Sequence, residues 1–471
     1  MADLTPGEKR WTVLYGAYEG IEQQALFEMY RGMQFHVNYV MAVRAARDAD
    51  PTALEHVLAL GTAATNPLIA DWMARGVMPK PPGPQGYVLW IGPTPWNAAH
   101  RLIVIAGADA AGVLYGVQEL LATFSANRVP LDKPVQRRAS LATMADRVVV
   151  EAPAVADRGI WTWGYVIYDY RRFLDNMARL KFNMLTVWNS EVPLNLPEIA
   201  AYAHQRGIKV VVGFNWGWGY NNLDISRAED RAFIKKLALD TYRREYQGQP
   251  IDGIYFQTLT EHTTQEIAGR SVAAWCGDMV NDIAAGFYEL APELSIQFGL
   301  HATSIRSHYT DLAGLDPRMI ITWEDAGALP FCYSPDPAYG DGYEATLAYA
   351  KQLAAFRPGT PFALVPKGWM SLRWDDEFAK HGPFLLGERD AAWIRDRTTA
   401  RQGEWNSINS MWLRHYPLAV RFYREVLAVN PCVLATGLVE DGLFDARIQP
   451  SVSLLAEMLW NPRQPDADLL A

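Results

Sequence analysis

The sequence is poor in cysteine and has no excess of basic residues. Its 471 residues include only three cysteines, Cys276, Cys332 and Cys432, which are too few and too scattered for a disulfide framework or a thiolate zinc site. Lysine and arginine number 43 against 52 aspartates and glutamates, so the formal net charge is −9. Because a nucleic-acid-binding protein needs a basic face, we expect no nucleic-acid partner.

Long apolar runs are also missing. No uninterrupted apolar run reaches the ~18 residues that are needed to span a bilayer. Residues 1–11 contain no apolar stretch of the signal-peptide type. We therefore expect a cytoplasmic protein without a membrane partner, while the formation of a homo-oligomer stays open. Half of the residues are apolar and 20% are charged, so a large buried core is within reach.

The first third of the chain indicates two different segments. Residues 1–50 are expected to form a helical N-terminal extension, because apolar positions such as Trp11, Leu14 and Tyr18 recur at spacings of three and four. Residues 51–145 instead alternate short apolar strands with helices, which is typical of a small α/β accessory domain.

Residues 146–471 predict a (β/α)8 barrel. Eight apolar strands are expected, each followed by a helix: 159–164, 183–189, 208–218, 253–262, 294–303, 319–325, 362–370 and 432–441. A doubly wound sheet usually has fewer strands and a glycine-rich phosphate loop after the first one. Here the first strand ends in Trp161-Thr162-Trp163-Gly164 and no such loop follows. The predicted fold class is therefore α/β, with a TIM barrel preceded by the accessory domain and the helical segment. We expect no cofactor.

Tryptophans gather at the expected carboxyl ends of the barrel strands, where such barrels carry their active sites. Seven of the 17 lie there: Trp161, Trp163, Trp188, Trp216, Trp218, Trp323 and Trp369. A tryptophan ring offers a flat apolar wall with one N–H donor, and the C–H faces of sugars stack on such walls. We interpret the set as a sugar-binding platform, with Trp161, Trp216 and Trp369 foremost. The alternative is that several of them pack loops against helices.

Few carboxylates share these strand ends. Glu261 ends the fourth strand, and Glu324-Asp325 ends the sixth. A carboxyl at the end of a buried strand should have a raised pKa, so Glu261 is a candidate general acid. Carboxylates from strands four and six can face each other across a substrate, as glycoside hydrolysis requires. Neighbouring strand residues face opposite ways, so either Glu324 or Asp325 points into the site. The alternative is that these carboxylates hold loops by salt bridges.

Other polar side chains at the strand ends suit sugar hydroxyls. They are His262, His301, Asn189 and Asn215. Lys367 could bind a substrate carboxylate, or it could pair with Asp375 or Asp376. Glu440-Asp441 is followed by Gly442, with an arginine close by, which favours a salt-bridged turn over a catalytic role.

Two stretches of the chain resemble a known group of glycoside hydrolases. Residues 102–121, LIVIAGADAAGVLYGVQELL, contain a strand with I-x-G-x-D and a helix that starts G-x-x-Y-G. They resemble the accessory α/β domain that precedes the barrel in β-N-acetylhexosaminidases and α-glucuronidases. The barrel opening, residues 157–160 followed by 175–183, is also similar to that group. The resemblance spans most of the chain and implies a glycosidase with a TIM barrel.

The resemblance departs from the hexosaminidases at the acid. Those enzymes carry an Asp-Glu pair at the end of strand four, in which the Asp supports the substrate's acetamido group as the nucleophile. The corresponding pair here is Thr260-Glu261. The α-glucuronidases use a lone acid and separate carboxylates on later strands, a pattern that Glu261 fits together with Glu324 or Asp325.

The sequence therefore predicts an exo-acting glycoside hydrolase of oligosaccharides, with Glu261 and either Glu324 or Asp325 as catalytic carboxylates. One alternative is a non-hydrolytic carbohydrate-binding protein on a glycosidase scaffold. Another is a metal-dependent lyase or isomerase of sugar acids, which would need several ligands on adjacent strand ends. Only Glu261-His262 together with His301 approaches such a set, so we expect no metal site.

Overall fold

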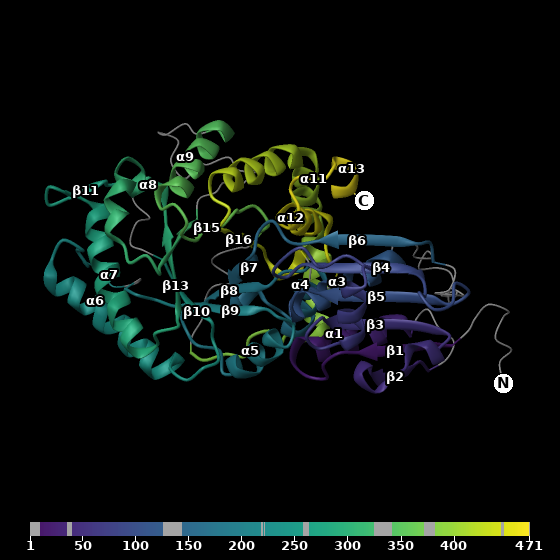
Figure 1. Cartoon of the computed structure of the whole chain (residues 1–471). Coiled ribbons are helices and arrows are strands. Elements are labelled where there is room, and N and C mark those ends of the chain that lie inside the picture. The colour runs from purple at the N-terminus through teal and green to yellow at the C-terminus, as the bar shows by residue number, and fades with distance from the viewer. Residues whose placement is uncertain are drawn as a thin grey trace. The chain divides into compact units, whose positions relative to one another are not determined.

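The chain divides into two compact units, residues Met1–Pro153 with Gln205–Gly207, and residues Ala154–His204 with Ile208–Ala471 (Figure 1). The computed structural model describes residues 10–34, 40–125, 144–217, 220, 222–257, 263–324, 342–371, 382–443 and 447–470. Within these ranges, none of the helices combines the length and the apolarity that crossing a bilayer would require.

The first unit is built on one six-stranded sheet with the order β2-β1-β3-β5-β4-β6. Its strands are β1 (Trp11–Tyr15), β2 (Ala42–Ala45), β3 (His56–Thr62), β4 (Tyr87–Pro93), β5 (Arg101–Gly107) and β6 (Arg147–Glu151). The first four strands in this order run parallel, whereas β4 is antiparallel to both of its neighbours. The helices of this unit are α1 (Gly20–Met33), α2 (Pro67–Ala74) and α3 (Ala110–Ser125).

The structure corrects the expected helical N-terminal extension. In the described part of that segment, α1 and a short 3-10 helix at Ala46–Asp48 are helical, whereas residues 11–15 and 42–45 form strands of the sheet. Trp11, Val13 and Leu14 are all buried. A parallel strand covered on both faces shows no alternation of apolar and polar residues, so its pattern is easily taken for a helix. The sheet also extends past the expected boundary at residue 145, because β6 belongs to the first unit.

The start of α2 follows local rules that the sequence already contains. The Asn66 side chain accepts hydrogen bonds from the backbone N–H groups of Leu68 (3.1 Å) and Ile69 (3.4 Å), and Pro67 occupies the first helical position. An asparagine cap satisfies amides that have no partner within the helix, and proline has no such amide to lose. The helix then buries Ile69 and Trp72 against one face of the sheet.

The second unit is a closed barrel with the strand order β10-β13-β14-β15-β16-β7-β8-β9, in which all neighbours are parallel. The strands are β7 (Arg158–Trp163), β8 (Met184–Trp188), β9 (Lys209–Gly213), β10 (Gly253–Gln257), β13 (Ser295–Leu300), β14 (Ile320–Trp323), β15 (Phe362–Leu364) and β16 (Val433–Leu438). Each of them lies within or next to a strand expected from the sequence. The predicted (β/α)8 barrel is therefore confirmed.

Helices follow the strands around the barrel (Figure 1). They are α4 (Tyr170–Arg179), α5 (Leu196–His204), α6 (Ala228–Thr241), α7 (Val272–Leu290), α8 (Ala302–Ile305), α9 (Tyr343–Phe356), α11 (Ala391–Val429), α12 (Pro450–Trp460) and α13 (Asp466–Leu469). A two-stranded hairpin, β11 (Glu266–Ile267) with β12 (Arg270–Ser271), interrupts the connection from β10 to α7. The 39-residue α11 is the longest of these helices.

Strand alternation sorts the side chains of the barrel into two layers. One apolar cluster fills the interior and consists of Trp161, Met184, Val211, Tyr255, Ile320, Ala363, Val365, Leu434 and Leu438. The larger cluster lies between the strands and the helices and takes the alternate residues, such as Ile160, Leu185 and Ile321. Successive strand residues point to opposite faces, so every second residue of a strand points into the barrel and the residues between them point toward the helices.

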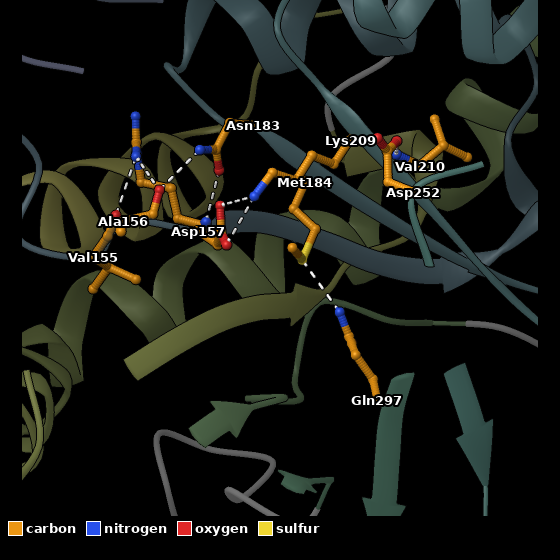
Figure 2. Close-up of polar contacts among 10 residues, drawn as sticks. Val155, Ala156, Asp157, Asn183, Met184, Lys209, Val210, Asp252 and Gln297 are labelled. Atoms are coloured by element: carbon orange, nitrogen blue, oxygen red, sulfur yellow. Dashed lines mark hydrogen bonds and ion pairs between the residues drawn. The ribbon is translucent and has the colours of Figure 1, made fainter. Parts of the chain in front are cut away.

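Hydrogen bonds join the amino ends of β7, β8 and β9 at the barrel floor (Figure 2). Arg158 is fully buried, and its backbone N–H donates to Asn183 Oδ1 at 2.8 Å. Asn183 Nδ2 donates to the Ala156 carbonyl at 2.8 Å, and Lys209 Nζ lies 2.8 Å from Asp157 Oδ1. In barrels of this kind the floor contributes stability and the opposite face carries the chemistry.

We expect Asn183→Ala to lower the free energy of unfolding by about 2–4 kcal/mol. The substitution leaves the Arg158 N–H and the Ala156 carbonyl without their side-chain partner, and each unsatisfied buried group costs ~1–3 kcal/mol. Urea unfolding of the whole chain measures the change. Asn406→Ala, at an exposed position of α11, is the control and should change stability by less than ~0.5 kcal/mol. Equal stability of the two variants would contradict the structural role of Asn183.

Candidate active site

Glu324 is a buried carboxylate at the carboxyl end of β14. It is 4% exposed, and its backbone N–H continues the ladder by donating to the Leu300 carbonyl at 3.1 Å. The hydroxyl of Tyr255, in β10, donates to Oε1. Oε2 lies 3.1 Å from Nε2 of His301, which follows β13. Three neighbouring strands thus deliver one carboxylate and two groups that hold it, one at each oxygen.

The surroundings of Glu324 keep it ionised. Burial is the largest single influence and raises the pKa of this carboxyl, because it disfavours the charged form. The charge and hydrogen bond of His301, the charge of Lys367 and the hydrogen bond of Tyr255 act in the opposite direction. Together they outweigh burial, so the pKa of Glu324 lies below its ordinary value.

An ionised carboxylate suits some catalytic roles and not others. It can attack an electrophilic carbon, take a proton from water, or stabilise a positive charge that develops in a transition state. It does not suit a general acid, which must hold a proton at the working pH. Glu324 therefore has the ionisation expected of the second carboxylate of a pair.

Several residues singled out in the sequence lie outside the described part of the chain. They are Trp218, Glu261, His262 and Asp325, together with Asp375 and Asp376 as the expected partners of Lys367. Lys367 itself is described, and its charge acts on Glu324. Within the described ranges, no three His, Cys, Asp or Glu side chains converge as the ligands of a metal ion would.

Three of the seven tryptophans belong to the barrel interior. Trp161 lies in the interior cluster, and Trp163 and Trp188 pack against it. The Trp161 ring meets Trp163 edge to face, with centroids 4.9 Å apart, and meets Tyr255 in the same way at 5.6 Å. Trp188 lies so close to Gly213 that a Cβ on that glycine would overlap the ring. Trp163 and Trp188, at the ends of β7 and β8, are half-buried, whereas Trp161 beneath them is only 4% exposed.

The other described tryptophans have a structural role, which corrects the expected ring of seven. Trp216, Trp323 and Trp369 lie in the outer cluster between strands and helices. Trp216 stacks on Phe256 with centroids 3.6 Å apart, and Trp369 stacks on Trp412 of α11 at 3.9 Å. Because their faces are covered by protein, we leave these three out of the sugar platform.

Four more candidates hold loops in place. Asn189 Oδ1 accepts from the Gly164 N–H at 2.9 Å, and Asn215 Oδ1 accepts from the Gly217 N–H at 2.8 Å. The other two are fully buried carboxylates after β16. Glu440 accepts from the Ser371 hydroxyl at 2.8 Å and from the Trp405 indole N–H, and Asp441 accepts from the Tyr168 N–H. The last two support the sequence-based preference for a turn over a catalytic role.

Tyr255 is the site residue that the sequence reasoning missed. Strand parity offered a signal, because Tyr255 and Glu261 are six residues apart and an even spacing on one strand predicts the same face. A buried tyrosine also needs a partner for its hydroxyl. Which group would be that partner could not be read from the sequence, since Glu324 is 69 residues away.

Solved structures share this architecture at low sequence identity. Streptomyces plicatus N-acetyl-β-hexosaminidase aligns with a TM-score of 0.53 at 14% identity, over 98% of this chain and 88% of that one. The β-N-acetylhexosaminidase of Bacteroides fragilis aligns with a TM-score of 0.52 at 13% identity, over 97% and 88%. The chain has the fold of the β-N-acetylhexosaminidases. No family model and no curated protein sequence matches it.

The hexosaminidase fold agrees with the resemblance seen in the two sequence segments. A third neighbour, the β-N-acetylhexosaminidase of Streptomyces coelicolor A3(2), aligns with a TM-score of 0.51 at 13% identity, over 98% of this chain and 89% of that one. These likenesses concern the fold. The α-glucuronidase side of the resemblance rests on the sequence alone.

We expect Glu324→Gln to remove part of the acid sensitivity of folding. Because the pKa of Glu324 is lowered in the folded state, its ionisation stabilises the fold at every pH above the ordinary pKa of an unfolded glutamate. This contribution is lost as the pH falls through the folded pKa. The stability difference between wild type and Glu324→Gln should therefore shrink from pH 7 to pH 3, as urea unfolding at each pH would show.

Glu229→Gln is the matched control for this titration. Glu229 is exposed in the first turn of α6, and its replacement should change stability little at any pH in the series. A stability difference between wild type and Glu324→Gln that stays constant from pH 7 to pH 3 would contradict a lowered pKa.

Proposed function

We propose that the protein is an exo-acting glycoside hydrolase of oligosaccharides, with Glu261 as the general acid and Glu324 as the second carboxylate. The observation that carries the proposal is the buried Glu324 carboxylate, held at both oxygens by Tyr255 and His301 at the carboxyl end of β14. Glu261 follows β10 in the sequence, and only β13 separates β10 from β14 in the barrel.

The two carboxylates divide the reaction between them. Glu261 would give its proton to the glycosidic oxygen as the bond from this oxygen to the anomeric carbon breaks. Glu324 would either attack the anomeric carbon or remove a proton from the attacking water, which distinguishes retention from inversion. In both cases one water is consumed, the sugar leaves with a hydroxyl at its anomeric carbon, and the acid regains its proton.

Thr260 bears on which of these mechanisms the chain can use. In the resembling hexosaminidases, an Asp at this position supports the acetamido group of the substrate as the nucleophile. Threonine cannot supply that negative charge. A carboxylate from the sixth strand, already ionised, supports a mechanism with two protein carboxylates instead. A mutant of the Streptomyces plicatus β-hexosaminidase has been solved in complex with its product GlcNAc, so a hexosamine belongs among the sugars to be tested.

A non-hydrolytic carbohydrate-binding protein is the second candidate, and Thr260 is the observation that favours it. The half-buried rings of Trp163 and Trp188 would serve binding and catalysis equally well. The two functions differ only in turnover, so the same experiment separates them.

We expect the purified protein to release sugar from disaccharides of N-acetylhexosamines, hexoses or hexuronic acids. Glu261→Gln should lower turnover of a natural disaccharide by on the order of 10²–10⁴, with binding retained, because the proton donor is lost. Glu324→Ala should stop turnover, and added azide should restore part of it by acting as a small nucleophile. Chromatography of the released sugars measures each rate, and Glu229→Gln is the control with wild-type turnover.

Three outcomes would contradict this prediction. Binding of a sugar without turnover of any disaccharide in the wild type would favour the carbohydrate-binding protein. Wild-type turnover by Glu324→Ala would show that the catalytic partner of Glu261 is another residue. Wild-type turnover by Glu261→Gln would show that Glu261 is not the general acid.

We expect Trp188→Ala and Trp216→Ala to act on different properties. Trp188 is half-buried at the mouth, so its loss should weaken binding of the released monosaccharide by about 1–3 kcal/mol through lost apolar contact. Trp216 is buried in the outer core, so its loss should cost about 3–5 kcal/mol of unfolding free energy and leave the affinity of the folded protein unchanged. Titration calorimetry and urea unfolding measure the two effects. If Trp216→Ala weakens sugar binding and Trp188→Ala does not, the roles assigned to these two tryptophans would be reversed.

A further inference from the structure

The hydrogen bond between Tyr255 and Glu324 crosses a whole strand of the barrel. Tyr255 lies in β10 and Glu324 follows β14, while β13 runs between these two strands and pairs with both. Neighbouring strands lie about 4.8 Å apart, so side chains two strands apart are separated by about 10 Å. They can meet over the middle strand only where that strand leaves room.

Gly299 supplies this room. It is the β13 residue that pairs with Gln257 of β10 on one side and with Thr322 of β14 on the other. A Cβ on Gly299 would overlap both the Tyr255 hydroxyl and Glu324 Oε1. The backbone of Gly299 is not in the left-handed region, so its conformation does not require glycine. What requires it is the close approach of the two side chains.

We propose that Tyr255 is a positioning residue for the hydrolytic reaction, that it acts through Glu324, and that Gly299 keeps open the gap in β13 through which the two meet. This inference deepens the proposed function and rests on it, because it takes Glu324 as the second carboxylate. Tyr255 itself is not expected to touch the substrate, since it is fully buried.

The geometry explains how a hydroxyl in the barrel interior can act on the site. Tyr255 holds Oε1 while His301 holds Oε2, so the plane of the carboxylate is fixed from two sides. The Tyr255 ring is in turn held edge to face by Trp161. A hydrogen bond donated to a carboxylate favours its ionised form. The charged and titratable groups that act on Glu324 include Tyr255 from β10, His301 after β13 and Lys367 after β15.

Tyr255→Phe tests the inference with the loss of one oxygen atom. We expect kcat to fall by about 10- to 100-fold, which is the loss typical of a hydrogen bond to a charged group. KM should change by less than about twofold, because substrate contacts are untouched. The acidic limb of the pH profile should move upward, because Glu324 then binds its proton more tightly. Tyr423→Phe is the control, since Tyr423 is a fully buried tyrosine of α11 in the outer core.

A second measurement does not depend on activity. The side-chain carboxyl of Glu324 can be followed by NMR in protein labelled with ¹³C at glutamate Cδ, with the signal assigned by its loss in Glu324→Gln. Its titration midpoint should be higher in Tyr255→Phe than in wild type and unchanged in Tyr423→Phe. An unchanged midpoint in Tyr255→Phe would overturn the inference. A raised midpoint in a protein without glycosidase turnover would instead overturn the proposed function and leave the link between Tyr255 and Glu324 standing.

Gly299→Ala tests the gap itself. The added methyl group should push the two side chains apart and lower kcat at least as much as Tyr255→Phe does. The double variant should lose no more than Gly299→Ala alone, because both changes break the same contact. Gly277→Ala in α7 is the matched control, since a Cβ there would lie 3.8 Å from Leu312 Cδ2, an ordinary contact. Wild-type kcat in Gly299→Ala, or additive losses in the double variant, would overturn the role of the glycine.

Discussion

A charged carboxylate inside a packed barrel is the feature on which the candidate site depends. Apolar side chains such as Met184, Val211 and Leu434 fill much of the interior. Transferring an ionised carboxylate into such surroundings is costly unless other groups hold it. Tyr255, His301 and Lys367 act together to offset that cost for Glu324. Strands β10, β13 and β14 must therefore place Tyr255, His301 and Glu324 side by side for Glu324 to stay charged.

The limited space inside a closed barrel explains why large residues lie beside glycines at the mouth. Trp188 stands beside Gly213, and the Tyr255–Glu324 contact passes over Gly299. In both cases a large inward side chain occupies the space that a glycine on a neighbouring strand leaves free. A closed barrel has a fixed interior, so each added ring needs a position elsewhere that gives up its side chain. These glycines are part of the site although they carry no chemistry of their own.

Polar and charged side chains occur at both ends of the barrel, but their hydrogen-bond partners differ. At the floor, Asn183 and Lys209 satisfy backbone groups and the carboxylate of Asp157. At the mouth, Glu440 and Asp441 also fix loops, whereas Glu324 is held by side chains that come from other strands. A carboxylate at a strand end is thus no sign of catalysis by itself; what distinguishes Glu324 is that its partners are Tyr255 and His301.

Much of the fold follows from local patterns in the sequence. Eight short apolar runs separated by helices predicted the barrel, and Asn66-Pro67 marked the start of a helix. The pattern failed for Trp11–Tyr15, because a strand buried on both faces shows no alternation. It also could not separate Trp161, Trp163 and Trp188 from Trp216, Trp323 and Trp369, since this depends on the residue at which each strand turns its side chains inward.

The candidate site could also be predicted only in part from the sequence. The sequence by itself determined that Glu324 ends a strand at the catalytic face of a barrel, beside His301 at the end of the preceding strand. Only the tertiary structure decided that Glu324 meets Tyr255 across β13 and that Gly299 allows it. Contacts between residues 69 positions apart depend on barrel closure and register, which local propensity does not encode.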